Sequence, residues 1–391
     1  MKKKNTIKPT RGNFNILRQI CNLIPEHEVS KDQARTFSPW RPHRQPAGRA
    51  TGSWHRTQWL GDSLQLRSGP LSTIRGATPP SRNGLSRANR KRSPAMAEKL
   101  FWRTLDHLTQ QTPAFAAGKR RGPAFRFKMP IHVIDSTTME LVAHCLDWAR
   151  HRRRKAAAKT HMRLNLQSLL PGFVIVDTAA EHDNKRAREL CAGLNSGEIA
   201  LFDKRYVDFG HLRDLDWRGI SWVTRAKENM VYEVMRKMPA SKDAKILRDE
   251  VIVLSNENKP APELMRRVVA LVQIDGEERE MTFLTNNLAW SPRSVADLYR
   301  CRWQIEVFFK QIKQTLQLGD FLGHNAHAVR WQMWTALLTY VLLRYLSHLS
   351  KRAHSFTRLF TLLRAALWEK YDLLKLLACY GTAGKYFHQV S

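Results

Sequence analysis

Five short runs of strand-forming residues between Ile131 and Arg225, separated by helix-type segments, constrain this fold more than any other feature of the sequence. The intervening pattern includes a helix that opens after Asp183, which can serve as its N-cap, and continues through Leu194. Three strands, a helix, a strand, a short helix and a further strand predict an α/β core built on a mixed sheet. The predicted strands are residues 131–136, 161–167, 172–177, 198–203 and 220–225.

The residue pattern of the chain differs on either side of this core. Further strand-type runs, "DEVIVLS", "RRVVALVQI" and "EMTFLTN", lie between Arg225 and Ala289, and the turn "DGEE" before the last run favours a hairpin. A β-rich insertion is therefore expected at 226–289. Helices are predicted within 13–36 and at 95–108, from about Ser291 to Leu316, and around 328–349 and 356–376.

The segment from Arg41 to Leu60, "RPHRQPAGRATGSWHRTQWL", contains no Val, Ile, Phe or Met. Such a composition is typical of a disordered basic linker. It is also typical of a shifted reading frame, in which case the segment would not encode the structure that its surroundings require. Both interpretations stay open at this point, and residues 41–95 are treated as anomalous.

The charge of the chain indicates a polyanionic partner. Its 391 residues include 65 Lys and Arg against 34 Asp and Glu, a formal net charge of +31. Neutralising phosphates releases counterions, so nucleic acid is the first candidate. The longest apolar run, Met333 to Leu349, is interrupted by charge and is too short for a membrane span. There is no apolar segment after Met1 to suggest a secretory signal, and five widely spaced cysteines fit a reducing cytoplasm.

Three carboxylates stand where catalysis would use them. Asp135 lies inside an apolar strand, Asp203 ends another strand, and Glu306 lies on the long helix. Each has an ordinary explanation: a hydrogen bond to the backbone after Asp135, a turn at Asp203, and an i,i+4 ion pair for Glu306. Together, however, two strand carboxylates and one helix carboxylate can meet at a sheet edge and form the oxygen-only site that Mg²⁺ prefers.

The helix around Glu306 carries a polar stripe. Tyr299, Arg302, Glu306 and Lys313 are separated by 3, 4 and 7 residues, a spacing that places all four on one face of a regular helix. A hydroxyl, a guanidinium, a carboxylate and an ammonium group on one face are suited to holding a phosphate beside a metal ion.

These motifs resemble those of a known family. The stretches "IDST", "LFDKRYVDF" and "WVTRAKENMVYEV", followed by the Tyr-x2-Arg-x3-Glu-x6-Lys pattern, are similar to those of DDE transposases of the bacterial insertion-sequence-four family. The resemblance covers about Phe125 to Leu349. It implies a ribonuclease-H-like catalytic core with a β-rich insertion between Asp203 and Glu306, flanked by helical regions.

The resemblance also implies a mechanism. Two Mg²⁺ ions, with Mn²⁺ as a substitute, would be held by Asp135, Asp203 and Glu306 for cleavage and strand transfer of double-stranded DNA. The DNA would carry terminal inverted repeats and a target site, and a homodimer on DNA is expected. Tyr299, Arg302 and Lys313 would grip the phosphate at the transposon end.

Other basic residues are candidates for contact with the DNA backbone. The run "WARHRRRKAAAKTH", from Trp148 to His161, is expected between the first two strands, and it is either a solvated charged face or a phosphate contact through Arg153, Arg154 and Lys159. Arg225 and Lys227 follow a strand end within a stretch that matches the family.

The expected function is therefore that of a transposase. The alternatives are a degenerate transposase remnant that only binds DNA, and a different ribonuclease-H-like nuclease without strand transfer. The expected location is the bacterial cytoplasm, in association with the nucleoid. The expected regions are an N-terminal helical and basic region at 1–124, a catalytic core at 125–225 and 290–330, the insertion at 226–289 and C-terminal helices at 331–391.

Overall fold

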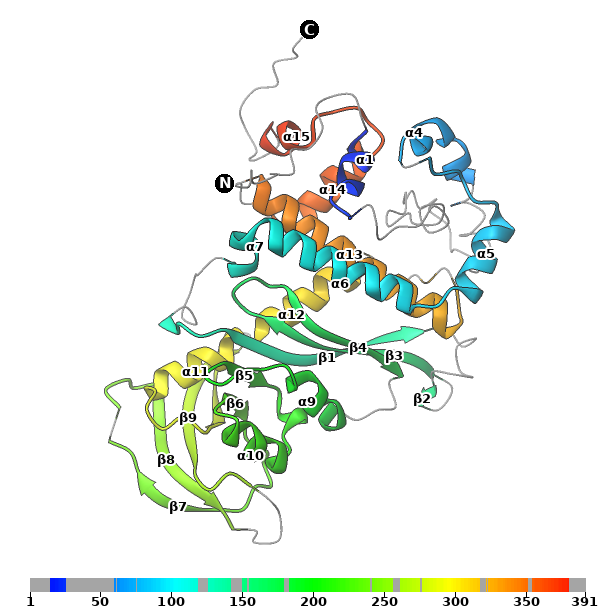
Figure 1. The fold of residues 1–391 in the computed structure, drawn as a ribbon. Helices are drawn as coiled ribbons and strands as arrows, with labels where there is room; N and C mark the ends of the chain where they lie inside the picture. The colour runs from blue at the N-terminus through cyan, green and yellow to red at the C-terminus, as the bar shows by residue number, and fades with distance from the viewer. Residues whose placement is uncertain are drawn as a thin grey trace, which may run out of the picture. The chain divides into compact units, whose positions relative to one another are not determined.

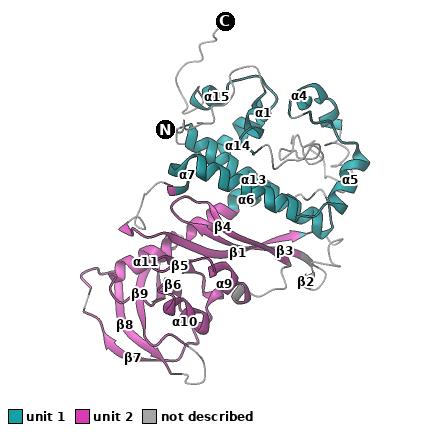
Figure 2. Cartoon of the chain, in the orientation of Figure 1, with its two compact units in different colours: residues 1–116, 141–148, 310–391 teal, residues 117–140, 149–309 magenta. Residues whose placement is uncertain are grey.

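The computed structural model describes a chain whose contacts divide it into two compact units (Figure 2). Unit 1 comprises residues 1–116, 141–148 and 310–391, and unit 2 comprises residues 117–140 and 149–309. The structure describes residues 15–25, 60, 62–74, 76–118, 126–141, 150–152, 155–178, 183–239, 241–255, 261–274, 276–316, 321, 323–350 and 354–379.

Unit 2 is built on a ten-stranded mixed sheet (Figure 1). The strands follow the order β2-β3-β1-β5-β6-β10-β9-β8-β7, and β4 pairs with β3. The described strands are β1 (Ile131–Leu141), β2 (Arg150–Arg152), β3 (Lys155–Asn165), β4 (Pro171–Thr178), β5 (Ile199–Phe202), β6 (Ser221–Arg225), β7 (Tyr232–Lys237), β8 (Ile246–Leu254), β9 (Met265–Ile274) and β10 (Glu277–Thr285).

The centre of this sheet is parallel and buried. β1 pairs with β5 and β5 with β6 in parallel, and all four residues of β5 are buried. Parallel neighbours need crossover connections, which are usually helices. Here they are α9 (Asp183–Cys191) before β5 and α10 (Phe209–Trp217) before β6, and Figure 1 shows both beside these strands. The expected mixed α/β, ribonuclease-H-like fold class is confirmed.

The predicted β-rich insertion is also present as strands. β7, β8, β9 and β10 form an antiparallel series, and β10 pairs with β6, so they extend the central sheet. Gly276 lies between β9 and β10 with a φ of 86°, a conformation that glycine adopts without strain. The expected helix after Ser291 follows β10.

That helix begins as predicted but is not regular throughout. Ser291 caps it by accepting a hydrogen bond from the Ser294 N–H, and Pro292 occupies the first turn. α11 (Pro292–Cys301) ends before Arg302, whose N–H donates to the Tyr299 carbonyl in a tighter i→i−3 bond of 3.0 Å. α12 (Trp303–Lys310) follows, and residues Gln311–Thr315 form a π-helical turn, η5. The long helix predicted from Ser291 to about Leu316 is therefore present, but it is irregular at Arg302 and at residues 311–315.

A buried cluster packs the sheet of unit 2 against α9 and α10. Its largest members, Trp222, Phe202 and Tyr206, are at most 1% exposed. Tyr206 belongs to the short 3₁₀ helix η4 (Lys204–Tyr206) that directly follows Asp203. The cluster therefore fixes the ends of the strands from which the candidate carboxylates project.

Unit 1 is helical in its described parts. α6 packs against α13, where Phe101 and Trp334 have ring centroids 5.4 Å apart. The segment around α1 is hydrogen-bonded to the C-terminal region, since the Ile16 N–H donates to the Glu369 carbonyl. The helices are α1 (Ile16–Cys21), α4 (Ser68–Ser72), α5 (Arg82–Lys91), α6 (Ala95–Gln111), α7 (Pro113–Ala117), α13 (Ala326–Leu349), α14 (Phe356–Ala366) and α15 (Leu373–Cys379).

The basic run from Trp148 to His161 was expected between strands, but Arg150–Arg152 form β2 and residues from Lys155 onward belong to β3, so that part of the prediction was wrong. Of the residues 41–95 treated as anomalous, 41–59, 61 and 75 lie outside the described residues, whereas α4 and α5 lie among the described ones. No helix in the part of the chain that the structure describes is long and apolar enough to cross a membrane.

Candidate functional site

Asp135 and Asp203 project from neighbouring parallel strands at matching positions. The register pairs Ile134 of β1 with Phe202 of β5, and each aspartate is the next residue on its strand path. β1 continues to Leu141, but its pairing with β5 ends at Ile134 and Phe202, so the two aspartates directly follow the last paired residues of the two strands. This is the geometry that the sequence predicted for them.

The surroundings of Asp135 link it to the other two carboxylates. Burial raises its pKa to about 6, against the opposing effects of the Arg302 charge and the Ser136 N–H, and the negative charges of Asp203 and Glu306 raise it further. The Ser136 N–H donates to Asp135 Oδ1 at 2.7 Å. Three carboxylates therefore share one electrostatic environment in unit 2.

Arg302 lies between two of these carboxylates. Its Nη1 donates to Asp135 Oδ2 at 2.7 Å, and its Nη2 donates to Glu306 Oε1 at 2.5 Å. The Arg302 side chain is 14% exposed, so these charge-assisted bonds are largely shielded from water. The i,i+4 ion pair that could have explained Glu306 is thus present, but the same guanidinium also reaches across to β1.

Asp203 is not an ordinary turn residue. It occupies the N-cap position of η4, where its carbonyl accepts a 3.0 Å hydrogen bond from the Tyr206 N–H. Its carboxylate makes no capping hydrogen bond there. The side chain is therefore available to act beside Asp135.

Tyr299 adjoins this cluster but is packed. It is 7% exposed, its ring centroid lies 4.9 Å from that of Phe283, and the Arg302 guanidinium lies 5.5 Å from its ring. Burial raises the pKa of its hydroxyl; the nearby positive charges of Arg302 and Arg225 oppose this, and Asp203 adds to it. Tyr299 is therefore part of the site, but most of its side chain is buried.

Arg225 and Lys227 line a pocket of about 260 Å³ in unit 2. Arg225 ends β6 and is close enough to Tyr299 to influence its pKa. The Lys227 Nζ donates to the Val207 carbonyl at 2.9 Å. Arg225 therefore lies near Tyr299, and Lys227 contacts the segment that follows Asp203.

The remaining predicted contacts are distributed differently. Lys159 lies within β3, in register with Asp177 of β4. Lys313 lies on η5 within unit 1, where burial lowers its pKa. The π-helical turn at 311–315 departs from the regular helix that the 3-4-7 spacing assumes, and Lys313 belongs to the other unit from Tyr299. Arg153 and Arg154 lie outside the described residues.

The donor set fits a hard divalent cation, although the side chains are not arranged around one. Within the described ranges, no three His, Cys, Asp or Glu side chains stand close enough together to share a metal ion. Asp135 and Glu306 instead share Arg302, which supplies the positive charge that these carboxylates need. Carboxylate oxygens are the donors that Mg²⁺ or Mn²⁺ prefers.

The bridging position of Arg302 was missed by sequence reasoning. Its spacing to Glu306 indicated a helix pair, but nothing local could indicate the contact with Asp135, 167 residues away. The sequence offered one indication of such a contact, namely the excess of positively charged residues near the three predicted carboxylates.

Comparisons with known proteins identify the family of this chain. The family model of the transposase DDE domain matches residues 126–342. A protein of Sinorhizobium fredii named as a transposase is 29% identical over 75% of this chain and 79% of its own length. The Escherichia coli transposase InsG of insertion sequence element IS4 is 24% identical over 47% of this chain and 42% of its own.

A solved structure of the piggyBac transposase, in a synaptic complex with hairpin DNA, covers 96% of this chain and 75% of its own with 10% identity and a TM-score of 0.46. The family match spans more than half of the chain and includes Asp135, Asp203 and Glu306. The resemblance to insertion-sequence transposases is confirmed by the named relatives. The chain therefore belongs to the DDE transposase family.

Proposed function

We propose that unit 2 carries the active centre of a transposase that cleaves and joins DNA at insertion-sequence ends with a divalent metal. The observation that carries the proposal is that Asp135 and Asp203 follow paired residues of neighbouring parallel strands, while Arg302 bridges Asp135 and Glu306. The relatives named as transposases support this reaction class.

Asp135, Asp203 and Glu306 would hold the Mg²⁺ ions, with Mn²⁺ as a substitute, and bound metal of this kind lowers the pKa of a coordinated water and neutralises phosphate oxygens. The three carboxylates are fixed from β1, from the end of β5 and from α12. Two of the three therefore rest on a buried parallel strand pair, which holds their positions without reorganisation.

Arg302 would bind the carboxylates first and a DNA phosphate afterwards. Without DNA it binds Asp135 and Glu306, as the distances of 2.7 and 2.5 Å record. When it leaves these carboxylates, its planar fork is free for the phosphate beside the scissile bond, which a guanidinium can bind through two parallel hydrogen bonds. Tyr299 would orient Arg302 through its ring, and Arg225 and Lys227 would add positive charge beside it.

The decisive experiment is cleavage and joining of DNA that carries the element's own terminal inverted repeats, with Mg²⁺, Mn²⁺ or EDTA. Glu306→Gln is expected to lose cleavage and joining by at least about a hundredfold, because it removes one anionic donor while keeping the side-chain volume. Glu189→Gln is the matched control, since Glu189 is also a helix carboxylate paired with an arginine, Arg186.

The outcomes separate the alternatives. Cleavage that survives Glu306→Gln contradicts the assignment of the site. DNA binding without cleavage by the unsubstituted chain favours a remnant that only binds. Cleavage without joining favours a nuclease. A homodimer on DNA is part of the proposal, because two ends must be joined, and sedimentation of the protein with end DNA measures it.

A further inference from the structure

A second cluster of arginines lies on α11, away from the carboxylates. The Asp297 carboxylate contacts three guanidinium groups: Arg126 at 2.6 Å, Arg293 at 3.3 Å and Arg300 at 3.4 Å. Arg293 also donates to Asp243 at 2.6 Å. We call Arg126, Arg293 and Arg300 the arginine cluster.

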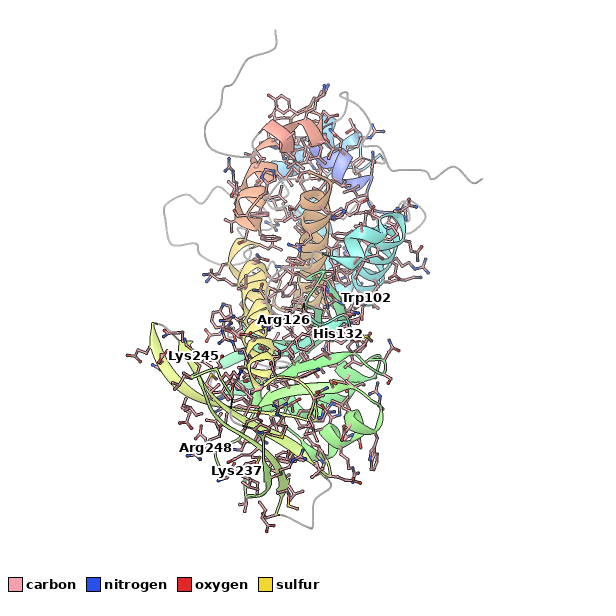
Figure 3. All side chains as sticks on the ribbon, turned by 90° about the vertical axis from the view of Figure 1, so that its left-hand side faces the viewer. Trp102, Arg126, His132, Lys237, Lys245 and Arg248 are labelled. Carbon is pink, nitrogen blue, oxygen red and sulfur yellow. The ribbon has the colours of Figure 1, made fainter. Side chains whose placement is uncertain are left out.

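The cluster is assembled from two parts of unit 2. Arg293, Asp297 and Arg300 are spaced i, i+4 and i+7, so they form one stripe along α11. Arg126 comes from the segment before β1, and Figure 3 labels it beside the helical segment. At about 100° per residue, Asp297 lies about 160° and Arg300 about 100° around the helix from Tyr299, so the stripe is centred on a different face of α11 from Tyr299.

The exposure of these side chains indicates that the three arginines can also contact a ligand from solvent. The Asp297 side chain is 8% exposed, whereas Arg126, Arg293 and Arg300 are 56%, 45% and 58% exposed. Each guanidinium carries about five N–H donors in a planar fork. A buried carboxylate thus holds three guanidiniums close together while their outer edges face solvent.

Such an arrangement suits an anion with several acceptor oxygens. Three guanidiniums would repel one another without Asp297, and the cluster with its two aspartates still carries a net positive charge. Because the arginines are already positioned, binding a phosphate would cost less side-chain entropy than it would with three mobile arginines. In addition, one guanidinium can bind two phosphate oxygens at once through parallel N–H groups.

We propose that the arginine cluster, arranged by Asp297, binds the DNA backbone at a phosphate separate from the one that is cleaved. This inference rests on the proposed function, that the chain acts on DNA. A site on a different face of α11 from Tyr299 acts on DNA affinity and register, and not on the chemical step. Arg300 thereby becomes a DNA-binding residue.

The first test measures DNA binding by the full chain in EDTA, by fluorescence anisotropy of a fluorescein-labelled DNA duplex over a series of salt concentrations. Arg126→Gln and Arg300→Gln are each expected to weaken binding several-fold and to reduce the salt slope by about one. Arg188→Gln is the matched control, because Arg188 is 55% exposed and pairs with Asp214 and Asp208. Loss no greater than that of Arg188→Gln overturns the proposal.

The second test uses Asp297→Asn, which removes one negative charge without changing the shape of the side chain. If the arginines act only through net charge, this variant binds DNA more tightly, and the proposal that Asp297 arranges a clamp is overturned. If the clamp is correct, binding weakens severalfold although the chain has become more basic. The Arg126 and Arg300 variants stand as the independent test if Asp297→Asn does not fold.

Failure of this inference can be told apart from failure of the proposed function. Metal-dependent cleavage of end DNA by the unsubstituted chain, with normal duplex binding by the Arg126 and Arg300 variants, overturns only the arginine cluster. Binding that depends on the cluster, with no cleavage under any metal, overturns only the proposed catalysis.

Discussion

The guanidinium of Arg302 lies 2.7 Å from the carboxylate of Asp135, a residue 167 positions earlier in the chain. The same guanidinium holds Glu306, so one cation compensates two carboxylates of the candidate metal site. A structure that keeps these carboxylates together without metal requires such compensation, because like charges in a buried site repel. Arg302 therefore stands in for part of the positive charge that the proposed metal would bring.

The first prediction concerns Arg302→Gln. Without the guanidinium, the carboxylates lose their compensation, so Mn²⁺ binding is expected to tighten severalfold and the metal-free protein to unfold more easily. Isothermal titration calorimetry with Mn²⁺, in the absence of DNA, measures the first effect. Arg186→Gln is the control, because Arg186 also bridges two carboxylates, Asp177 and Glu189, outside the site. Unchanged Mn²⁺ affinity in Arg302→Gln would show that Arg302 does not compete with the metal.

The second prediction concerns the buried ion pair of the insertion. Arg266 holds Asp249 through two hydrogen bonds of 2.7 and 2.6 Å, and the two side chains are 3% and 6% exposed. Asp249→Asn removes the negative charge beside a buried guanidinium that then keeps only neutral partners, among them the Leu288 carbonyl, so a loss of roughly 3–5 kcal/mol in unfolding free energy is expected. Urea denaturation measures it.

The control for that pair is Glu277→Gln, which breaks the exposed pair of Glu277 with Arg279, side chains that are 72% and 58% exposed. An exposed pair contributes about 0–1 kcal/mol, so this variant is expected to unfold close to the unsubstituted chain. Equal losses in Asp249→Asn and Glu277→Gln would contradict the role of burial.

The third prediction compares two tryptophans. Trp222 of β6 is fully buried in the unit 2 cluster, whereas Trp217, at the end of α10, is 71% exposed with Arg213 over its ring at 4.3 Å. Trp222→Ala is expected to cost about 3–5 kcal/mol of unfolding free energy, and Trp217→Ala less than about 1 kcal/mol. Urea denaturation followed by circular dichroism distinguishes them. Similar midpoints for the two variants would place Trp222 outside the stabilising core.

The sequence was sufficient for the parts of the fold that depend on local pattern. The apolar runs that end in Asp135 and Asp203 read as strands, and parallel pairing then brings their ends to one sheet edge. The Ser291 cap and Pro292 likewise identified the start of α11. These features are set by hydrophobic periodicity and by local hydrogen bonds, which a single sequence displays.

What the sequence did not predict depends on contacts between distant residues. "KAAAKTHMRLN" lacks strong strand formers at its start, and β3 exists there because β4 and β2 pair with it. The helical spacing of Tyr299 and Glu306 is consistent with a regular helix, so the tight turn at Arg302 and the π-helical turn at 311–315 could not be seen. The contact of Arg302 with Asp135 likewise needs the assembled sheet.

The last prediction concerns His211, which lies in α10 and is 3% exposed, with the Phe202 ring 6.2 Å away. Burial lowers its pKa to about 4, and the nearby Arg188 charge contributes in the same direction. The folded protein therefore holds His211 neutral, whereas the unfolded chain binds a proton below about pH 6.5. Its contribution to stability is complete above pH 6.5 and is lost as the pH falls towards 4.

His211→Gln removes this titration. The free energy of unfolding of the unsubstituted chain is expected to fall more steeply between pH 7 and pH 4.5 than that of the variant, with a difference of up to roughly 3 kcal/mol. Urea denaturation at a series of pH values measures both curves. The variant keeps a residual slope, because burial also lowers the pKa of His132 to about 4. Parallel curves for the two proteins would mean that His211 is protonated equally in the folded and unfolded states, against its buried position beside Phe202.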